Sequence, residues 1–416
     1  MKATLDDCAI FGGPSEFDAP LHVGRPNVGD RGAILERIGA ALDRRWLTND
    51  GPNVCEFESR VANLTGVRHC VAVSSGTMAL ALAARAAGLT GEVIVPSFTF
   101  VGTAHALLWL GITPVFCDVD PQTHNIDPLR VEELITPRTS GILGVHLWGR
   151  PCDIGALERI AEEHGLRLLF DAAHAFGCRY QGAMIGSFGD AEAFSFHATK
   201  CVNTCEGGAI VTQDSELAAK ARAMRNFGFV DYDCAAGLGV NGKLNEISAA
   251  IGLASLDAMG GFLQANRSNY ACYGSQLQGV AGVRLVRYEE RGASNYHYIV
   301  LEIDEARAGL SRDALRDMLW RENVLARRYF YPGCHRMKPY SDLFPGAGAG
   351  LPETERLCSR VLCLPNGTAV GTGEIERLCH IIRFATEHAA EIGTRLAAGR
   401  QRGARESLSV GRREEL

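Results

Sequence analysis

The chain has 416 residues, of which 46% are hydrophobic and 22% charged, and this composition excludes a wholly disordered protein. The length corresponds to two or three domains, and two is the simpler expectation. With 42 basic against 48 acidic side chains, the net charge is −6, so no surplus of positive charge is available to neutralise a nucleic-acid backbone. We therefore expect no nucleic-acid partner.

The sequence also predicts neither a membrane partner nor a metal site. The apolar runs are short, and none approaches the ~20 residues that span a bilayer. The N-terminus carries two aspartates before a weak apolar patch, which is not the pattern of a signal peptide. Most of the 14 cysteines stand among apolar neighbours, and none forms a CxxC pair with zinc spacing. We expect reduced, buried thiols in a cytoplasmic protein.

Between residues 69 and 212, short apolar runs rich in Val, Ile and Phe alternate with stretches of helical spacing. Such runs are typical of strands that are buried on both faces of a parallel sheet. The alternation predicts an α/β domain with a mostly parallel, seven-stranded sheet and helices on both of its faces. The expected strands are 69–73, 92–96, 114–119, 141–147, 167–173, 191–196 and 207–212, and the expected helices are 77–88, 103–110, 128–135 and 154–164.

The character of the sequence changes after about residue 261. A strand expected at 295–303 and a helix expected at 311–323 indicate a second, smaller α+β domain. We place the boundary at Gly260–Gly261, which gives a large domain of residues 1–260, N-terminal segment included, and a small domain of residues 261–395. Residues 396–416 are polar and mixed in charge, and we expect them to form a disordered tail.

The segment SSGTMAL (74–80) follows an expected strand and begins an expected helix. Gly76 allows close approach to the backbone, and Thr77 offers a hydroxyl beside the free N–H groups of the helix N-terminus. This combination suits a phosphate group. An ordinary strand–helix turn with Ser and Thr caps explains the same residues, and for this segment alone it is the better explanation.

Two charged residues follow other expected strands. Asp171 ends an apolar strand, where a carboxylate is costly unless a cation meets it, although a lone Asp that caps a turn explains it equally well. Lys200 lies in a turn rich in Ser, His and Thr, and partial burial would make its amine a nucleophile for aldehydes; a solvated surface lysine is the general alternative. Ligands gather at the carboxyl ends of parallel strands. Together, the three features supply a phosphate anchor, a pyridinium partner and a Schiff-base amine, the parts needed to bind pyridoxal phosphate.

Several motifs resemble, in order, those of the DegT–StrS family of sugar aminotransferases, which are fold-type-I pyridoxal phosphate enzymes. The likeness runs from about residue 20 to about residue 390. It implies a large domain with a mostly parallel sheet and a smaller C-terminal domain. The motifs are SSGTMAL, PSFTFVGTAHAL, PVFCDVDPQTHNIDP, GVHLWGRPCDI, DAAHAFG, FSFHATKCVNTCEGGAIVT and GVNGKLNEISAAIGLASL.

The resemblance implies roles for individual residues. Lys200 resembles the Schiff-base lysine and Asp171 resembles the partner of the pyridine nitrogen, so these two are the candidate catalytic residues. Relatives that deoxygenate sugars carry His in place of this lysine, so Lys200 favours transamination. The resemblance also implies a homodimer with shared active sites. The candidate cofactor-binding residues are Gly76, Thr77 and Ser195 at the phosphate, Phe100 on the ring face, His174 near the ring oxygen, and Asn241 at the phosphate of the neighbouring subunit's cofactor.

The segments 21–30 and 44–58 resemble the branch of the family that aminates C4 of dTDP-4-keto-6-deoxyhexoses in secondary-metabolite pathways. This branch implies a nucleotide-sugar substrate and L-glutamate as amino donor. The alternatives are an aminotransferase for a 3-keto sugar nucleotide or a keto-cyclitol, and a non-catalytic regulatory protein that binds the cofactor. The candidate substrate-binding residues are Trp46, Thr48, Tyr331 and His335, although the two aromatics could serve in packing and His335 as a cap.

Overall fold

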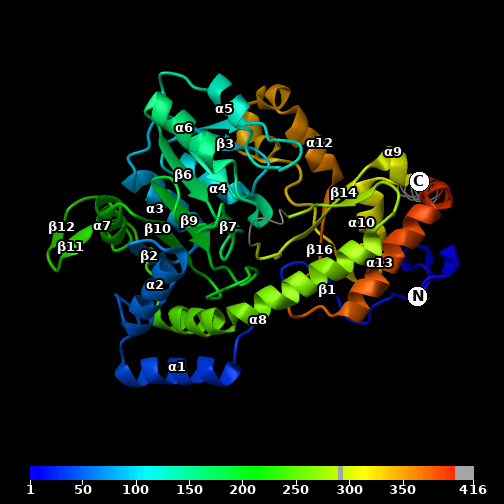
Figure 1. The fold of residues 1–416 in the computed structure, drawn as a ribbon, viewed down its shortest axis with the longest axis horizontal. Coiled ribbons are helices and arrows are strands. Elements are labelled where there is room, and N and C mark those ends of the chain that lie inside the picture. Colours follow the sequence, from blue (N-terminus) through cyan, green and yellow to red (C-terminus); the bar gives the residue numbers. More distant parts are fainter. Residues whose placement is uncertain (289–293, 399–416) are drawn as a thin grey trace, which may run out of the picture.

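The computed structural model describes residues 1–288 and 294–398. The N-terminal two thirds of the chain is built on one sheet with the strand order β2-β10-β9-β6-β5-β3-β4 (Figure 1). Neighbouring strands are parallel, except that β10 runs antiparallel to both β2 and β9. The predicted seven-stranded, mostly parallel sheet is therefore confirmed. Its strands are β2 (His69–Val73), β3 (Glu92–Pro96), β4 (Thr113–Cys117), β5 (Thr139–Val145), β6 (Arg167–Asp171), β9 (Ala191–Ser195) and β10 (Gly208–Thr212).

Different helices cover the two faces of this sheet (Figure 1). Most strand residues are buried, because each face packs against the apolar side of several helices. The four helices expected between the strands are present, with ends within a few residues of the expected ones. One face packs against α2 (Pro52–Thr65), α5 (Pro128–Glu133), α6 (Ile154–His164) and the first part of α8 (Glu246–Leu277), and the other against α3 (Gly76–Ala86), α4 (Val101–Leu108) and α7 (Ser215–Met224).

A second hydrophobic core surrounds an antiparallel sheet of three strands in the C-terminal part of the chain. The strand expected at 295–303 is present in shorter form as β14 (Ile299–Ile303), and the helix expected at 311–323 is α10 (Arg312–Arg321). The tail expected at 396–416 lies, from residue 399 onward, outside the described residues. The other main elements of this part are β13 (Val283–Leu285), β16 (Val361–Leu364) and α13 (Thr372–Glu387).

Helix α8 belongs to both cores. Leu253 lies in the core beneath the large sheet, whereas Tyr273 and Leu277 lie in the second core. The helix runs without interruption through Gly260 and Gly261, the position of the predicted domain boundary. Among the described residues, α8 is also the one helix long and apolar enough to cross a membrane. Core helices of globular proteins pass the same test, and half of its most apolar window is buried.

Shorter elements complete the described chain. Three pairs of short strands lie outside the two larger sheets: β1 (Leu21–His22) with β15 (Val324–Leu325), β7 (Arg179–Tyr180) with β8 (Ala183–Met184), and β11 (Phe229–Asp231) with β12 (Cys234–Ala235). The remaining helices are α1 (Arg31–Arg44), α9 (Glu305–Ala308), α11 (Tyr340–Leu343) and α12 (Pro352–Arg360). The 3₁₀ turns are η1 (Leu5–Asp7), η2 (Ala9–Phe11), η3 (Leu147–Gly149), η4 (Cys334–Arg336) and η5 (Ala347–Gly350).

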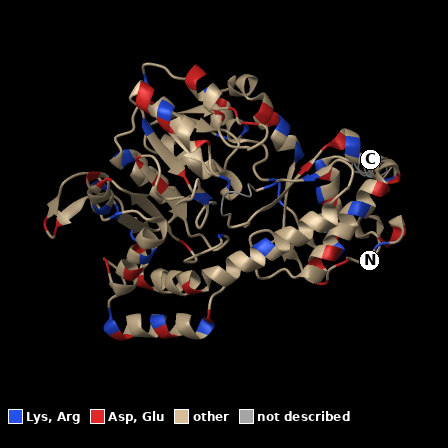
Figure 2. Cartoon of the chain, viewed as in Figure 1, with Lys and Arg blue, Asp and Glu red and all other residues tan. Residues whose placement is uncertain are grey.

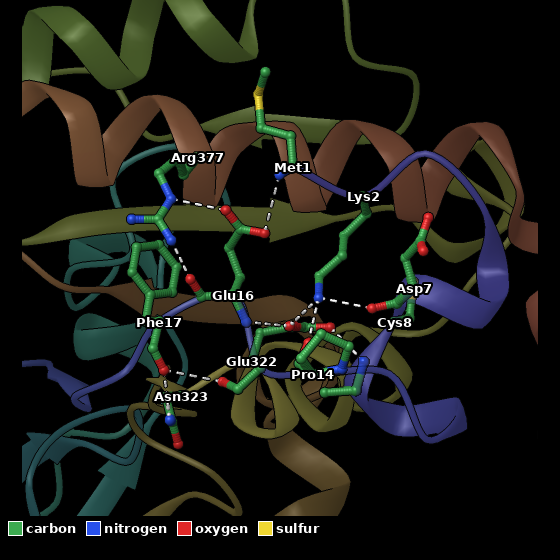
Figure 3. A network of polar contacts seen from close by, with 12 residues as sticks. Met1, Lys2, Asp7, Cys8, Pro14, Glu16, Phe17, Glu322, Asn323 and Arg377 are labelled. Atoms are coloured by element: carbon green, nitrogen blue, oxygen red, sulfur yellow. Dashed lines mark hydrogen bonds and ion pairs between the residues drawn. The ribbon is translucent and has the colours of Figure 1, made fainter.

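The first residues of the chain pack in the second core, although the predicted boundary places them in the large domain. A buried ion pair holds them there: the Lys2 ammonium lies 2.9 Å from a Glu322 carboxylate oxygen at the end of α10, and both side chains are almost fully buried (Figure 3). Glu322 also accepts hydrogen bonds from the backbone N–H groups of Ala9 and Glu16. Glu16 in turn pairs with Arg377 on α13. These contacts join segments that lie far apart in the sequence.

Removal of one partner of this buried pair should destabilise the fold. Lys2→Met leaves the Glu322 carboxylate without its cation, so we expect the free energy of unfolding to fall by about 3 kcal/mol. Urea unfolding followed by circular dichroism measures the change. Arg395→Ala is the control, because its pair with Asp6 is solvent-exposed and should contribute little to stability. Equal unfolding midpoints for Lys2→Met and the unmodified chain would contradict the anchoring role of Lys2.

Candidate active site

A cavity of about 440 Å³ lies at the carboxyl ends of the central strands. Its walls come from the turns after β2, β3, β6 and β9, and from residues of the C-terminal part of the chain. This is the position at which open α/β sheets bind their ligands. Of the proposed site residues, the cavity brings together Gly76, Thr77, Phe100, Asp171, His174, Ser195 and Lys200.

The Lys200 amine lies in this cavity, 3.3 Å from the hydroxyl of Tyr298. Burial lowers the pKa of Lys200 to about 8, because a poorly solvated ammonium is unfavourable, and the nearby Asp171 carboxylate limits the fall. His197 shapes the turn that carries the lysine: its backbone carbonyl accepts from the Lys200 N–H, and its Nδ1 accepts from the Thr199 N–H. A substantial share of the amine is therefore neutral and nucleophilic near pH 8.

Asp171 ends β6 and is buried at the floor of the cavity. Its carboxylate accepts hydrogen bonds from the Thr103 hydroxyl at 2.8 Å and from the Ala173 N–H at 3.0 Å. Thr99 supports this contact, because its hydroxyl lies 3.0 Å from that of Thr103. Burial nevertheless raises the pKa of Asp171, since too little positive charge faces it. A protonated ring nitrogen would supply the missing charge.

The N-terminus of α3 and the side chain of Ser195 form a cradle for an anion. Ser75 caps the helix by accepting from the Met78 N–H, and Thr77 places its hydroxyl in the first turn. A Cβ at position 76 would lie only 2.7 Å from Ser195 Cβ, so glycine is what lets the serine approach the helix end. The free N–H groups and hydroxyls match the oxygens of a phosphate monoester.

Aromatic rings also line the cavity. Phe100 precedes α4 and leaves more than half of its side chain exposed. His174 stacks with Trp148 and Phe330, and its Nδ1 accepts from the Trp148 backbone N–H, which leaves the proton on Nε2. Burial lowers the pKa of His174 well below its usual value, so this ring is a neutral hydrogen-bond donor. The site therefore fits an aromatic aldehyde that carries a phosphate and a basic ring nitrogen.

Five proposed residues do not line this cavity within one chain. Asn241 is exposed and forms an isolated β-bridge with Asn226, and Trp46 and Thr48 are exposed in the loop before α2. Tyr331 packs against two arginines outside the cavity, while His335 is buried between Ser97 and Glu355. The residues set apart in this way are Trp46, Thr48, Asn241, Tyr331 and His335.

The cavity also contains residues that no sequence motif indicates as site residues. Thr103 stands four positions after Thr99 at the start of α4, a helical spacing that places both hydroxyls on one side. Four more come from the C-terminal part of the chain, where no local pattern connects them with the sheet. They are Tyr298, Arg327, Tyr329 and Phe330.

Comparison with known proteins identifies relatives over most of the chain. Residues 30–383 match the DegT/DnrJ/EryC1/StrS aminotransferase family. A dTDP-4-amino-4,6-dideoxy-D-glucose transaminase of Shigella dysenteriae is 36% identical over 367 residues, which are 88% of this chain and 99% of that protein. A UDP-N-acetyl-3-dehydro-alpha-D-glucosamine 3-aminotransferase of Acidithiobacillus ferrooxidans is also 36% identical, over 85% of this chain and 94% of that protein.

The fold agrees with solved structures. The crystal structure of DesI in the presence of its TDP-sugar product matches with a TM-score of 0.91 and 51% sequence identity, over 95% of this chain and 100% of that one. The matched family consists of pyridoxal-phosphate-dependent sugar aminotransferases, which transfer nitrogenous groups. Because the match extends over residues 30–383, most of the chain, the chain belongs to the DegT/DnrJ/EryC1/StrS aminotransferase family.

Proposed function

We propose that this chain uses pyridoxal phosphate to transfer an amino group from L-glutamate to C4 of a dTDP-4-keto-6-deoxyhexose. The observation that carries the proposal is one cavity that holds a partly neutral lysine amine, a buried carboxylate and an anion cradle. These groups match the aldehyde, the ring nitrogen and the phosphate of the cofactor, each on a different turn of one sheet.

Each residue has a task toward the cofactor. The N-terminus of α3 and Ser195 would hold the phosphate, Asp171 would keep the ring nitrogen protonated, and Lys200 would attach to the aldehyde. When bound, pyridoxal phosphate supplies a ring that accepts the electrons left at the donor's α-carbon. The Lys200 amine, oriented by the Tyr298 hydroxyl, would remove the α-proton of the donor and, in the second half-reaction, would deliver a proton to the sugar carbon that receives the amino group. Because one lysine serves both half-reactions, we expect ping-pong kinetics.

Arg327 supports anionic substrates. Of the described residues that line the cavity, it is the one that carries a guanidinium, and this group lies 5.2 Å from the ring centre of Tyr329. Within the described part of the chain, its side chain makes no ion pair with an acidic residue. A guanidinium binds carboxylates and phosphates through paired hydrogen bonds. Both proposed substrates carry such groups: glutamate has carboxylates and the sugar nucleotide has a diphosphate.

The relatives support the choice of ketone. The transaminase of Shigella dysenteriae favours a dTDP-linked 4-keto sugar, and the equal identity of the Acidithiobacillus ferrooxidans enzyme makes a 3-keto sugar nucleotide the second candidate. Incubation with glutamate and a panel of dTDP-4-keto, UDP-3-keto and keto-cyclitol substrates, followed by mass spectrometry, tests the proposal. We expect amination of the dTDP-4-keto sugar. Exclusive amination of another ketone would refute the substrate, and no amination of any ketone would refute the reaction.

We further propose a homodimer in the cytoplasm that binds neither nucleic acid nor membrane. The β11–β12 hairpin projects from the body of the chain beside α7 (Figure 1), and its apolar side chains are exposed. Basic and acidic positions are interspersed along the ribbon (Figure 2), and the net charge is −6, so no surplus of positive charge favours nucleic acid. A second copy would cover the hairpin and place Asn241 at that copy's cofactor phosphate. The exposed side chains are Phe227, Phe229, Val230, Tyr232, Leu238 and Val240.

If each active site contains residues of both subunits, two variants that are inactive alone should restore activity when they are mixed. Lys200→Ala removes the amine, and Asn241→Asp places a negative charge at the proposed phosphate site, so we expect each alone to lose activity. A mixed dimer contains one site with intact Lys200 and intact Asn241. Unfolding and refolding the variants together should therefore recover about a quarter of the normal activity, as expected for random pairing with one intact site in each mixed dimer. No recovery in the mixture would contradict a shared site.

The lowered pKa of Lys200 predicts how cofactor capture depends on pH. The rate at which the cofactor-free protein gains visible absorbance with pyridoxal phosphate should rise as pH increases through about 8, where the amine loses its proton. In Asp171→Asn the transition should move to lower pH, because the Asp171 charge raises the pKa of Lys200. Lys200→Ala provides the background rate. A transition that stays in place in Asp171→Asn would show that the two groups do not interact.

A further inference from the structure

His335 lies at the centre of a hydrogen-bonded cluster that joins the two halves of the chain. Its Nδ1 is 2.7 Å from the Ser97 hydroxyl, and its backbone N–H donates to the same oxygen at 3.1 Å. Its Nε2 is 2.8 Å from a carboxylate oxygen of Glu355, which also accepts from the Arg336 guanidinium. Ser97 follows β3 in the large sheet, whereas His335 and Glu355 belong to the C-terminal part of the chain.

The hydrogen bonds fix the direction of each donor. Since the Glu355 carboxylate can only accept, His335 Nε2 carries a proton, and in the neutral ring Nδ1 accepts the proton of the Ser97 hydroxyl. Both ring nitrogens and the hydroxyl are then satisfied. The order Ser–His–Glu is also that of a hydrolytic triad. Ser97, however, is fully buried and does not line the cavity, so no substrate can reach its oxygen.

Two walls of the cavity meet at this cluster. The Cys334 N–H donates to the Ser97 carbonyl at 2.9 Å, which extends the contact along the backbone. On the side of the sheet, the chain continues from Ser97 to Phe100, which lines the cavity. On the other side, the segment just before Cys334 carries Phe330 and, further back, Arg327 into the same cavity. The cluster therefore connects the cavity-lining segment before Cys334 to the cavity-lining turn that follows β3.

The local sequence favours this arrangement. Gly333 has φ = +89°, a conformation that side chains disfavour, and a Cβ at this position would lie 2.9 Å from the His335 ring. Glycine before Cys334 thus lets the chain turn and the histidine ring lie against the backbone. Phe330, at the other end of the turn, stacks on Trp148 with ring centres 5.4 Å apart. A shift of this segment would move the cavity wall directly.

We propose that His335 is a positioning residue that fixes the substrate wall formed by Arg327, Tyr329 and Phe330 through its contact with Ser97. The kinetic part of this inference rests on the proposed aminotransferase function. A displaced wall holds the substrate in poorer geometry, so its main effect is weaker binding of the substrate. His335 acts through the segment it holds and does not itself touch the substrate.

Two substitutions of His335 separate its two contacts. His335→Asn keeps an oxygen near the position of Nδ1 that can accept from Ser97, but it cannot reach Glu355. His335→Gln keeps an N–H near the position of Nε2 that can donate to Glu355, but it loses the acceptor for Ser97. Ser97→Ala removes the shared hydroxyl with a loss of one atom. Arg336→Ala is the matched control, because Arg336 is exposed and contacts Glu355 without reaching Ser97.

Two readouts are measured on the full-length protein. The hydrogen–deuterium exchange rate of the peptide spanning residues 327–337 measures how firmly this segment is held in place. This readout does not depend on whether the chain is an aminotransferase. Steady-state kinetics report KM and kcat for the keto sugar. In Ser97→Ala and His335→Gln we expect exchange and KM to rise about tenfold while kcat changes less than about threefold. In His335→Asn and Arg336→Ala we expect the exchange rate and KM to stay within about threefold of the values for the unmodified protein.

Each outcome decides the proposal. Normal exchange and KM in Ser97→Ala overturn it, even if the melting temperature falls, because the cluster then serves stability alone. Equal effects in His335→Asn and His335→Gln also overturn it, since the ring itself or Glu355 would then be the important partner. If the unmodified protein aminates no ketone, the proposed function fails, and the exchange measurement still shows whether His335 holds the wall.

Discussion

Burial of the Lys200 amine beside the Asp171 carboxylate is the constraint on which the rest of the site depends. A low-dielectric cavity destabilises an ammonium and a carboxylate alike, so each group keeps its usual charge only as far as the other and its hydrogen-bond partners allow. The hydroxyls of Thr103 and Tyr298 provide part of that stabilisation. The cavity is therefore prepared for a ligand that brings a positive ring nitrogen to one group and an electrophilic carbon to the other.

Much of this site could be predicted from the sequence, because it lies on turns that follow strands. The β–α alternation is a local pattern, and parallel strands present their carboxyl ends at one edge, so residues as far apart as Thr77, Asp171 and Lys200 meet there. The resemblance to the DegT–StrS family implies, for each of these residues, the part of the cofactor that it would contact. Phe100 and Ser195 follow from the same resemblance, since both stand in motifs of that family, and both line the cavity.

The parts that could not be predicted depend on contacts between distant segments. Tyr298 and Phe330 enter the cavity from the C-terminal part of the chain, and no periodicity in their own segments indicates which surface they meet. The sequence places His335 near the substrate, yet the residue is bound to Ser97, 238 positions away. The N-terminal segment likewise packs in the second core through Glu322, 313 positions from Ala9. Such pairings are fixed by tertiary packing and not by local sequence preference.

Helix α8 has a mechanical consequence for the whole chain. Its two ends pack in different cores, so the helix is a direct mechanical link between the two cores. Gly260 and Gly261 lie on the exposed stretch in the middle, and nothing outside the helix lies within 4 Å of where their side chains would be. Glycine weakens a helix relative to alanine by about 1 kcal/mol per residue. A relative displacement of the two cores would therefore bend α8 most easily at this pair of glycines.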